Sequence, residues 1–298
     1  MIKVFLGISF LLLNNMKKYN DTDMKMYKLL LLCLFVPVLA FGQKWKLVWS
    51  EEFNYKGKPD AKFWSFEKGF ARNEELQWYQ DENAYCKKGV LVIEARKEKV
   101  LNPEYKKGDV NWKTSREYAE YTSSSINTEG KKDFLYGRVE VRAKISTACG
   151  SWPAIWTLGK DMEWPLSGEV DLMEFYRINN VPSILANAAW GTNVRWKAKW
   201  DGSNKPLSHF TEKDLNWAKK FHIWRMDWDK DFIRLYLDNE LLNEIDLSKT
   251  INPDGTNPFH QPQYLLLNLA IGRNGGDPSQ TKFPLVYEID YVRIYQQN

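Results

Sequence analysis

The sequence predicts an all-β protein, a sandwich of two antiparallel sheets, and three observations support this. Short alternating or apolar runs recur after Lys44, which is typical of strands. Convincing amphipathic helix patterns are absent from the same region. No linker, low-complexity tract or internal repeat divides it, so we expect one domain. The expected strands lie in residues 91–98, 137–145, 221–229, 232–247, 263–272 and 287–296.

The individual runs carry different signals. In residues 137–145 apolar side chains alternate with charged ones, as expected of a strand with one buried face. Residues 232–247 are interrupted by Asp238 and Asn239, and this pair between two strand-like runs indicates a hairpin. Residues 208–221 supply one short helical turn at most.

The start of the chain has the pattern of a secretory signal peptide. A basic beginning and a short apolar core are followed by the small residues Ala40 and Gly42. Met24 and Met26 are alternative starts of translation, and we expect cleavage near Gln43.

The chain therefore divides into a targeting region, residues 1–42, and one mature domain, residues 43–298. The apolar run after Lys28 is too short to span a bilayer comfortably, although a membrane anchor is the alternative. A lipid anchor at Cys33 is disfavoured, because the apolar run continues to Ala40 instead of ending at the cysteine. We expect export to the periplasm, the cell surface or the medium, and no membrane span in the mature protein.

Composition narrows the range of partners. Without residues 1–42 the chain carries 37 basic and 36 acidic side chains, so its basic character comes mainly from the targeting region. Nothing in that balance argues for nucleic acid binding. Two cysteines remain in the mature domain, Cys86 and Cys149, and their pairing state stays open. All 14 Trp follow residue 43, which fits an aromatic core or flat platforms for sugar rings.

Three carboxylates interrupt an otherwise apolar strand in the segment SGEVDLMEFY, residues 167–176. Alternation places Glu169 and Asp171 on one face of a strand, whereas Glu174 falls on the other. One extra residue inserted as a bulge, near Leu172 or Met173, returns Glu174 to the first face. Bulges are common beside active sites because they re-aim a side chain. The pattern therefore predicts three acids on one face of a bulged strand.

The expected spacing of the two glutamates suits one kind of hydrolysis. Four effective strand steps separate their backbones by about 13 Å, and inward-leaning side chains bring the carboxyls to about 5–6 Å. That separation is typical of retaining glycosidases, in which one carboxylate attacks and the other acts as acid and then base. A solvated strand face is the first alternative, disfavoured by the apolar flanks, and a metal site is the second, disfavoured by the scarcity of histidine.

The segment GEVDLMEF resembles the Glu-x-Asp-x-x-Glu signature of glycoside hydrolase family 16, in the bulged form of laminarinases, agarases and carrageenases. Other matching stretches follow in order through the domain, among them LVWSEEFN, NEELQWY, GVLVIEARKE, YTSSSINTEGK, YGRVEVRAKI, GSWPAIWTLG, LLLNLAIGRNGG and YEIDYVRIYQ. The resemblance implies a concanavalin-like β-jelly-roll sandwich whose concave sheet forms an open cleft. It also implies internal cleavage of β-linked polysaccharides with retention.

The resemblance also implies roles for particular residues. Glu169 is expected to be the nucleophile, Asp171 the assisting acid and Glu174 the acid/base. Trp152 and Trp156 match tryptophans that line the cleft beside the cleaved bond, and two core aromatics are the alternative.

Two further sites are carried over in the same way. Asn73 matches a residue that contacts sugar on the non-reducing side, with a turn asparagine as the alternative. Glu52, Gly89 through its carbonyl, and Asp290 match a structural calcium site on the convex face. A surface salt bridge is the alternative there. No cofactor is expected for the chemistry, since carboxyls fill both catalytic roles.

The sequence departs from the family pattern at two positions. Ser125 stands where members that cleave β-glucan usually carry an arginine that reaches the substrate. Trp190 stands where a histidine beside the acid/base is usual, so we expect it among the substrate-binding residues. An insertion that contains Trp196 and Trp200 is expected to wall one end of the cleft.

These departures leave the substrate open. A β-1,3/1,4-glucan-like polysaccharide is the first expectation for a secreted, monomeric endo-glycanase. A β-galactosidic glycan, such as an algal galactan or a host mucin or keratan-type chain, is the alternative. A transglycosylase with the same covalent intermediate and a non-catalytic carbohydrate-binding protein are the other classes considered.

Overall fold

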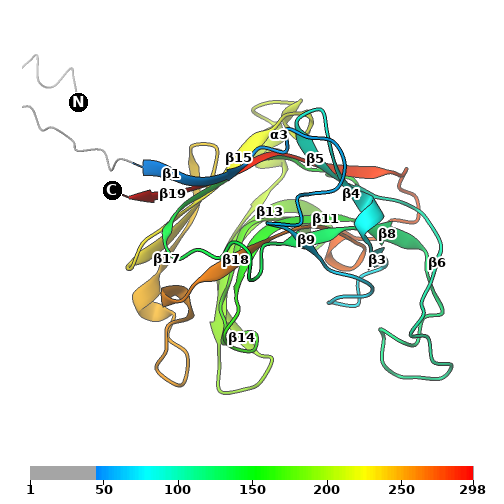
Figure 1. The fold of residues 1–298 in the computed structure, drawn as a ribbon, viewed down its shortest axis with the longest axis horizontal. Helices are drawn as coiled ribbons and strands as arrows, with labels where there is room; N and C mark the ends of the chain where they lie inside the picture. The colour runs from blue at the N-terminus through cyan, green and yellow to red at the C-terminus, as the bar shows by residue number, and fades with distance from the viewer. Residues whose placement is uncertain (1–44, 298) are drawn as a thin grey trace, which may run out of the picture. The chain divides into compact units, whose positions relative to one another are not determined.

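The computed structural model describes residues 45–297 and confirms an all-β fold with two large antiparallel sheets, which lie as two layers in Figure 1. The eight-stranded sheet contains β1 (Trp45–Glu51), β4 (Ala84–Lys87), β5 (Val90–Ala95), β10 (Gly137–Lys144), β15 (His222–Trp228), β16 (Phe232–Leu237), β17 (Glu240–Asp246) and β19 (Leu285–Gln297). The seven-stranded sheet contains β2 (Ser65–Phe66), β9 (Ser125–Asn127), β11 (Ser151–Gly159), β12 (Glu169–Ile178), β13 (Val181–Gly191), β14 (Ala198–Pro206) and β18 (Gln263–Ile271). Each of the six runs that predicted strands contains at least one.

Smaller elements connect the two sheets. β3 (Gln77–Tyr79) pairs in parallel with β8 (Tyr121–Ser123), which departs from the antiparallel pairing of the two large sheets. β6 (Val100–Leu101) and β7 (Tyr118–Ala119) form a second two-stranded sheet. The helical turns are α3 (Ser208–Thr211), η2 (Asp81–Asn83), η3 (Trp217–Lys219), η4 (Leu247–Lys249), η5 (Pro258–His260) and η6 (Arg273–Gly275). Residues 208–221, expected to supply one short helical turn at most, contain two, α3 and η3.

The core lies between the two large sheets and follows the strand alternation. In β10 the odd positions, including Val139 and Val141, are buried, while the charged even positions remain half-exposed. Burying such branched side chains stabilises the fold by about 1.5–3 kcal/mol each. Trp64, Trp224 and Trp228 are among the largest fully buried side chains, so part of the aromatic content is core.

The seven-stranded sheet has the order β14-β13-β12-β11-β18-β9-β2. β12, which carries the three carboxylates, therefore has two strands on one side and four on the other. The hairpin predicted at Asp238 and Asn239 is confirmed, because β16 and β17 pair on either side of these two residues.

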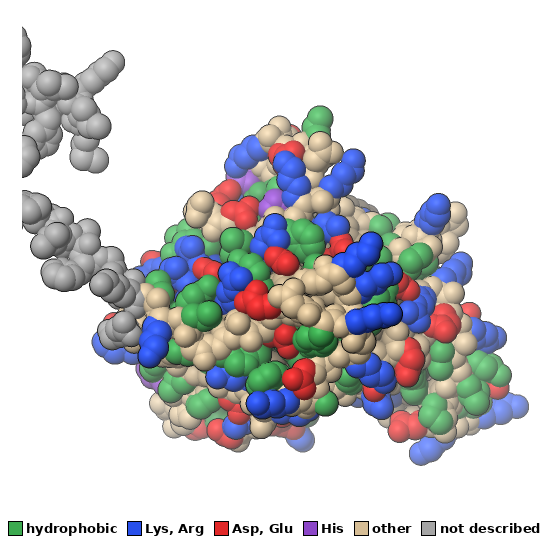
Figure 2. All heavy atoms as spheres, turned by 45° about the horizontal axis from the view of Figure 1, so that its top comes forward, with side chains coloured by type: hydrophobic (Ala, Val, Ile, Leu, Met, Phe, Trp, Pro, Cys, Tyr) green, Lys and Arg blue, Asp and Glu red, His purple; other side chains and the backbone are tan. Residues whose placement is uncertain are grey.

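The predictions for residues 1–42 lie outside the described residues. Within residues 45–297 no helix is long and apolar enough to cross a membrane. Cys86 is buried and Cys149 is exposed, and both are free thiols. Side chains of both charge signs are interspersed over the face shown in Figure 2, as the balanced composition of the mature domain suggested.

Candidate active site

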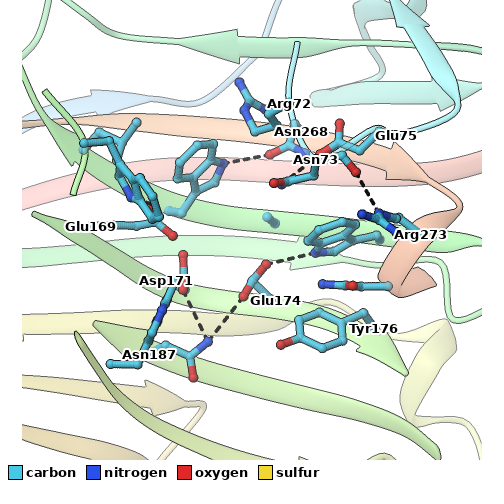
Figure 3. A pocket seen from close by; sticks show the side chains of 17 residues that line it. Arg72, Asn73, Glu75, Glu169, Asp171, Glu174, Tyr176, Asn187, Asn268 and Arg273 are labelled. Atoms are coloured by element: carbon cyan, nitrogen blue, oxygen red, sulfur yellow. Dashed lines mark hydrogen bonds between the residues drawn. The ribbon is translucent and has the colours of Figure 1, made fainter. Parts of the chain in front are cut away.

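A cleft of about 750 Å³ lies over the seven-stranded sheet. Figure 3 shows its side chains, which come from the strands of the sheet and from the loops around them. The lining residues are Arg72, Asn73, Glu75, Trp152, Ala154, Trp156, Leu158, Trp164, Glu169, Asp171, Glu174, Tyr176, Asn187, Trp200, Asn268, Arg273 and Asn274. All three carboxylates of the acidic segment are among them, together with Trp152, Trp156 and Asn73 from the predicted site.

A bulge in β12 brings the carboxylates together. Asp171 pairs with Asn187 of β13, whereas Glu174 pairs with Leu185, so three steps along β12 match two along β13. Leu172 and Met173 are both fully buried in the core. The extra residue therefore restores Glu174 to the cleft face, which confirms the predicted bulge.

Each glutamate receives a hydrogen bond from a tryptophan indole. The Trp164 Nε1 donates to Glu169 Oε2 at 2.7 Å, and the Trp152 Nε1 donates to Glu174 Oε1 at 2.9 Å. These donors fix one oxygen of each carboxyl, and Oε2 of Glu174 also contacts Asn187 Nδ2. Trp164 lies on the loop before β12 and was not predicted as a site residue.

Asn187 joins two of the acids from the neighbouring strand. Its Nδ2 lies 3.3 Å from Asp171 Oδ2 and 3.3 Å from Glu174 Oε2, as the dashed lines in Figure 3 show. Both contacts are at the long end for a hydrogen bond. The side chain therefore restrains Asp171 and Glu174 relative to each other.

Burial dominates the protonation of the acids. It raises the pKa of Glu169 to about 7, although the hydrogen bond from Trp164 opposes this. It also raises the pKa of Glu174 to about 7, against the hydrogen bond from Trp152. For Asp171 burial comes first, and the charges of both glutamates then push its pKa well above the usual range. Burial and its two charged neighbours thus favour the neutral form of Asp171.

One wall of the cleft contains an arginine beside a tryptophan. The Arg72 guanidinium lies 5.0 Å from the centre of the Trp156 ring, and Trp156 Nε1 donates to Asn268 Oδ1 at 2.7 Å. Arg72 forms an ion pair with Glu67, whose carboxylate also accepts a hydrogen bond from the Ser125 hydroxyl. Ser125 stands where the resemblance led us to expect an arginine. Through Glu67 it helps to hold a different cation, Arg72, which comes from another segment of the chain.

A fourth carboxyl, that of Glu75, lies beside Asn73. Glu75 is 2% exposed, and its Oε2 accepts a hydrogen bond from Gln77 Nε2 at 2.6 Å. The Asn73 Nδ2 contacts Glu75 Oε1 at 3.3 Å, and the Asn73 carbonyl accepts a hydrogen bond from Arg273 Nε. Burial raises the pKa of Glu75. Asn73, with a φ of 57°, is a turn asparagine that also lines the cleft, and its contact with sugar stays a prediction.

The expectation that Trp190 stands beside the acid/base is wrong. Asn187 and Ala189 share the cleft face of β13, so alternation directs Trp190 into the core, where it is 7% exposed. Asn187 occupies the place next to Glu174 instead.

The predicted calcium ligands have other partners. Glu52 forms a two-bond ion pair with Arg293, and Asp290 pairs with Arg142. Gly89 lies in the turn between β4 and β5. Among residues 45–297 no group of three or more His, Cys, Asp or Glu is arranged to hold a metal. Calcium binding by Glu52, Gly89 and Asp290 stays a prediction. The ion pairs of the two carboxylates with arginines do not favour it.

Among the cleft residues that sequence reasoning missed are Trp164, Asn187, Arg72 and Glu75. Trp164 precedes the acidic segment by only a few residues, and Glu75 lies inside the stretch NEELQWY, so proximity was a usable signal for these two. Asn187 and Arg72 meet the site only through strand pairing and loop packing, which no local pattern reports.

The fold and the cleft define a carbohydrate-cleaving enzyme of a known family. The sequence matches the profile of Glycosyl hydrolases family 16 over residues 70–293, more than half of the chain, and the protein belongs to this family.

Individual relatives agree with this assignment. A β-glucanase of Rhodothermus marinus is 33% identical over 272 residues, which cover 85% of each chain. The laminarinase catalytic domain from Thermotoga maritima is 32% identical with a TM-score of 0.69, covering 86% of this chain and 99% of that one. A structure from work on endo-acting O-glycanases of the human gut microbiota that initiate mucin breakdown is 36% identical with a TM-score of 0.76, covering 86% and 92%. The jelly-roll sandwich is therefore confirmed.

Proposed function

We propose that this glycoside hydrolase cleaves internal β-linkages of a polysaccharide by double displacement, with retention of configuration. The bulge in β12 supports this most directly, because it turns Glu169, Asp171 and Glu174 to one face of the cleft sheet. Glu169 is the nucleophile and Glu174 the acid/base.

The reaction proceeds in two steps. The Glu169 carboxylate attacks the anomeric carbon, the glycosidic C–O bond breaks, and the Glu174 proton passes to the leaving oxygen. Water then attacks the same carbon, gives its proton to Glu174, and releases Glu169 as a carboxylate. Since Trp164 holds Oε2 of Glu169, Oε1 is the attacking atom.

The neighbours of the two glutamates keep them in opposite protonation states. Burial raises the pKa of Glu174 most, and the negative charge of an ionised Glu169 raises it further. Once Glu169 has ionised, Glu174 therefore keeps its proton. Asp171, held neutral, donates a hydrogen bond to Glu169 and lowers the pKa of the nucleophile. This division of roles follows the usual logic of paired carboxyls in one site.

A β-1,3/1,4-glucan-like polysaccharide is the first candidate substrate. The support is the similarity to the β-glucanase of Rhodothermus marinus and to the laminarinase of Thermotoga maritima. The tryptophans of the cleft provide apolar faces against which pyranose rings pack.

A β-galactosidic glycan of the mucin or keratan type, or an algal galactan, is the second candidate. Two departures from the family pattern favour it over plain glucan. Ser125 stands where glucan-cleaving members usually carry an arginine, and the side chain that contacts Glu174 from β13 is an asparagine, Asn187, and not a histidine. The 36% identity to the structure from the work on mucin-degrading O-glycanases adds support.

One screen separates these candidates. Purified protein is incubated with β-1,3-glucan, mixed-linkage glucan, agarose, keratan and mucin glycans, and products are sized by mass spectrometry. We expect a ladder of oligosaccharides from one class, with the β-anomer formed first in NMR spectra. Monosaccharides as the sole product would contradict internal attack, and condensed longer products would identify a transglycosylase.

The catalytic assignment has its own test. Glu169→Ala and Glu174→Ala should each lower kcat by several orders of magnitude while the fold persists, because each removes a reacting group. Glu163→Ala is the matched control, since Glu163 is exposed, lies outside the cleft lining, and pairs with Arg195. Full activity in purified Glu169→Ala would refute the mechanism and leave a binding protein as the better description.

We also propose that the protein is exported and that it acts as a monomer. A polysaccharide substrate lies outside the cell, which agrees with the signal-peptide pattern of residues 1–42. Turnover that persists after chelation of calcium is expected, because the chemistry uses carboxyls alone. Loss of turnover in EDTA without loss of fold would contradict this expectation.

A further inference from the structure

Trp200 is a large exposed aromatic side chain that the proposed chemistry does not use. It lines the cleft from β14 and is 52% exposed. Trp196, four residues earlier, is 55% exposed but does not line the cleft. Leaving a tryptophan in water forgoes the gain from burying it, so its place in the lining suggests a ligand.

Strand pairing aligns Trp200 with the nucleophile. Glu169 pairs with Ala189 on β13, and Ala189 pairs with Trp200 on β14. Paired residues in an antiparallel sheet project to the same face, so all three point into the cleft. Two strand spacings, about 10 Å, separate the backbones of Glu169 and Trp200. Only the methyl group of Ala189 stands between them in this row.

The side of β14 that carries Trp200 is fixed by the next residue. The Asp201 carboxylate accepts a hydrogen bond at 3.2 Å from Asn243 of β17, which belongs to the other large sheet. Asp201 therefore points away from the cleft, and Trp200 must point toward it. Gly202 follows on the cleft side and adds no side chain that would cover the ring.

Trp200 also marks one end of the cleft. β14 is the edge strand of the seven-stranded sheet, while Asn268 lies on β18, on the other side of the carboxylates. A sugar chain that crosses the strands over β12 must leave the cleft across β14. Its next ring beyond the reacting pair then meets the indole.

We propose that Trp200 is a platform for a sugar ring, one that binds beyond the cleaved bond at the β14 end of the cleft. The C–H face of a pyranose packs on the indole, so the contact selects chain length and the position of cleavage. The platform rests on the proposed function, since it requires a sugar chain over β12.

Binding to the inactive Glu169→Ala protein tests the platform without turnover. Laminari-oligosaccharides and N-acetyllactosamine oligomers of increasing length are titrated by calorimetry into this protein with Trp200→Ala, Trp200→Phe or Trp196→Ala added. We expect Trp200→Ala to weaken binding about tenfold, but only above a threshold length, and Trp200→Phe to retain most of the affinity. Trp196→Ala should match the parent at every length.

Four outcomes overturn the platform, three of them in binding and one in turnover. The first is equal affinity of Trp200→Ala and Trp196→Ala at every oligomer length. The second is a loss of affinity in Trp200→Ala that is the same for short and long oligomers, because short chains do not reach the Trp200 ring. Failure of every oligomer to bind the parent would overturn it together with the carbohydrate assignment. The wild-type background separates the two claims: turnover with identical product sizes in Trp200→Ala and Trp196→Ala removes the platform and leaves the proposed function intact.

Discussion

At the scale of single residues, the cleft combines buried acids with tryptophans that donate hydrogen bonds to them. Trp152 and Trp164 each donate an indole N–H to one glutamate, so the two carboxyls are oriented before any substrate arrives. Hydrogen bonds to a charged acceptor are roughly twice as strong as neutral ones. Arg72 adds a more distant positive charge that lowers the pKa of Glu169.

Removing the Trp164 donor should change the pH dependence of turnover. Trp164→Phe keeps an aromatic ring but loses the N–H, so the ionised form of Glu169 loses a stabilising contact and its pKa rises. The acidic limb of the kcat/KM profile should move to higher pH, and kcat should fall about tenfold for a lost charged hydrogen bond.

A structural role for Trp164 alone would lower activity without moving the acidic limb. The measurement is therefore a full pH–rate profile, with Trp196→Phe as the control because Trp196 does not line the cleft. An unchanged acidic limb in Trp164→Phe would contradict the assigned contact.

At the scale of elements, the site depends on how β12, β13 and β14 are paired. The bulge sends Leu172 and Met173 together into the core, and Glu174 returns to the cleft. Asn187 of β13 then reaches Asp171 and Glu174. The Asn187 side chain also faces Gly202 of β14. A Cβ added at Gly202 would lie 2.7 Å from Asn187 Oδ1.

Gly202→Ala should therefore disturb the acids from two strands away. The new methyl group displaces the Asn187 amide, which then loses its contacts to Asp171 and Glu174. We expect kcat to fall about tenfold or more, while the melting temperature changes little because Gly202 is exposed. Kinetics of Gly202→Ala against Asn204→Ala, an exposed change two residues further on the same face, check this. Equal activity in the two variants would show that Asn187 does not position the acids.

At the scale of the whole molecule, the active site is a cost to stability. Three carboxyls are buried in one cleft, and burial raises the pKa of each above its usual range. The unfolded chain ionises Glu169 and Glu174 near pH 4.5, whereas in the folded protein these two glutamates resist ionisation until about pH 7. The folded state therefore binds more protons across this window, and its stability falls as pH rises.

Replacing one of the acids by its amide should reveal this cost. Glu174→Gln should melt at the same temperature as the wild type at pH 4, where both states of the wild type are protonated. Its advantage should grow between pH 4.5 and 7 and stay constant above, because the glutamine never ionises.

Melting curves from pH 4 to pH 8 measure this difference. Glu163→Gln is the control, since Glu163 is exposed and Arg195 lowers its pKa, so no such advantage arises. A Glu174→Gln advantage that is equal at pH 4 and pH 8 would contradict the raised pKa.

Local pattern alone was enough for the architecture and for the three carboxylates that share the cleft. Alternation in residues 137–145 and the apolar runs that became β18 and β19 predicted strands with buried faces, because a strand's side-chain period is two whatever its partner. The parity of Glu169, Asp171 and Glu174 required a bulge, since burying an unpaired acid in the core is costly. These inferences needed only neighbours along the chain.

Tertiary structure decided everything that depends on which strand lies beside which. Trp190 and Trp200 both stand among polar or small residues in the sequence. Trp190 is nevertheless in the core and Trp200 in the cleft, because the pairing with β12 decides which side chains of β13 and β14 face the cleft. Asn187 and Arg72 reach the acids from segments distant in sequence, through contacts that form only when the sheet is assembled. The sequence by itself therefore determined the acids and the fold class, and the register of the assembled sheet determined the residues that orient them.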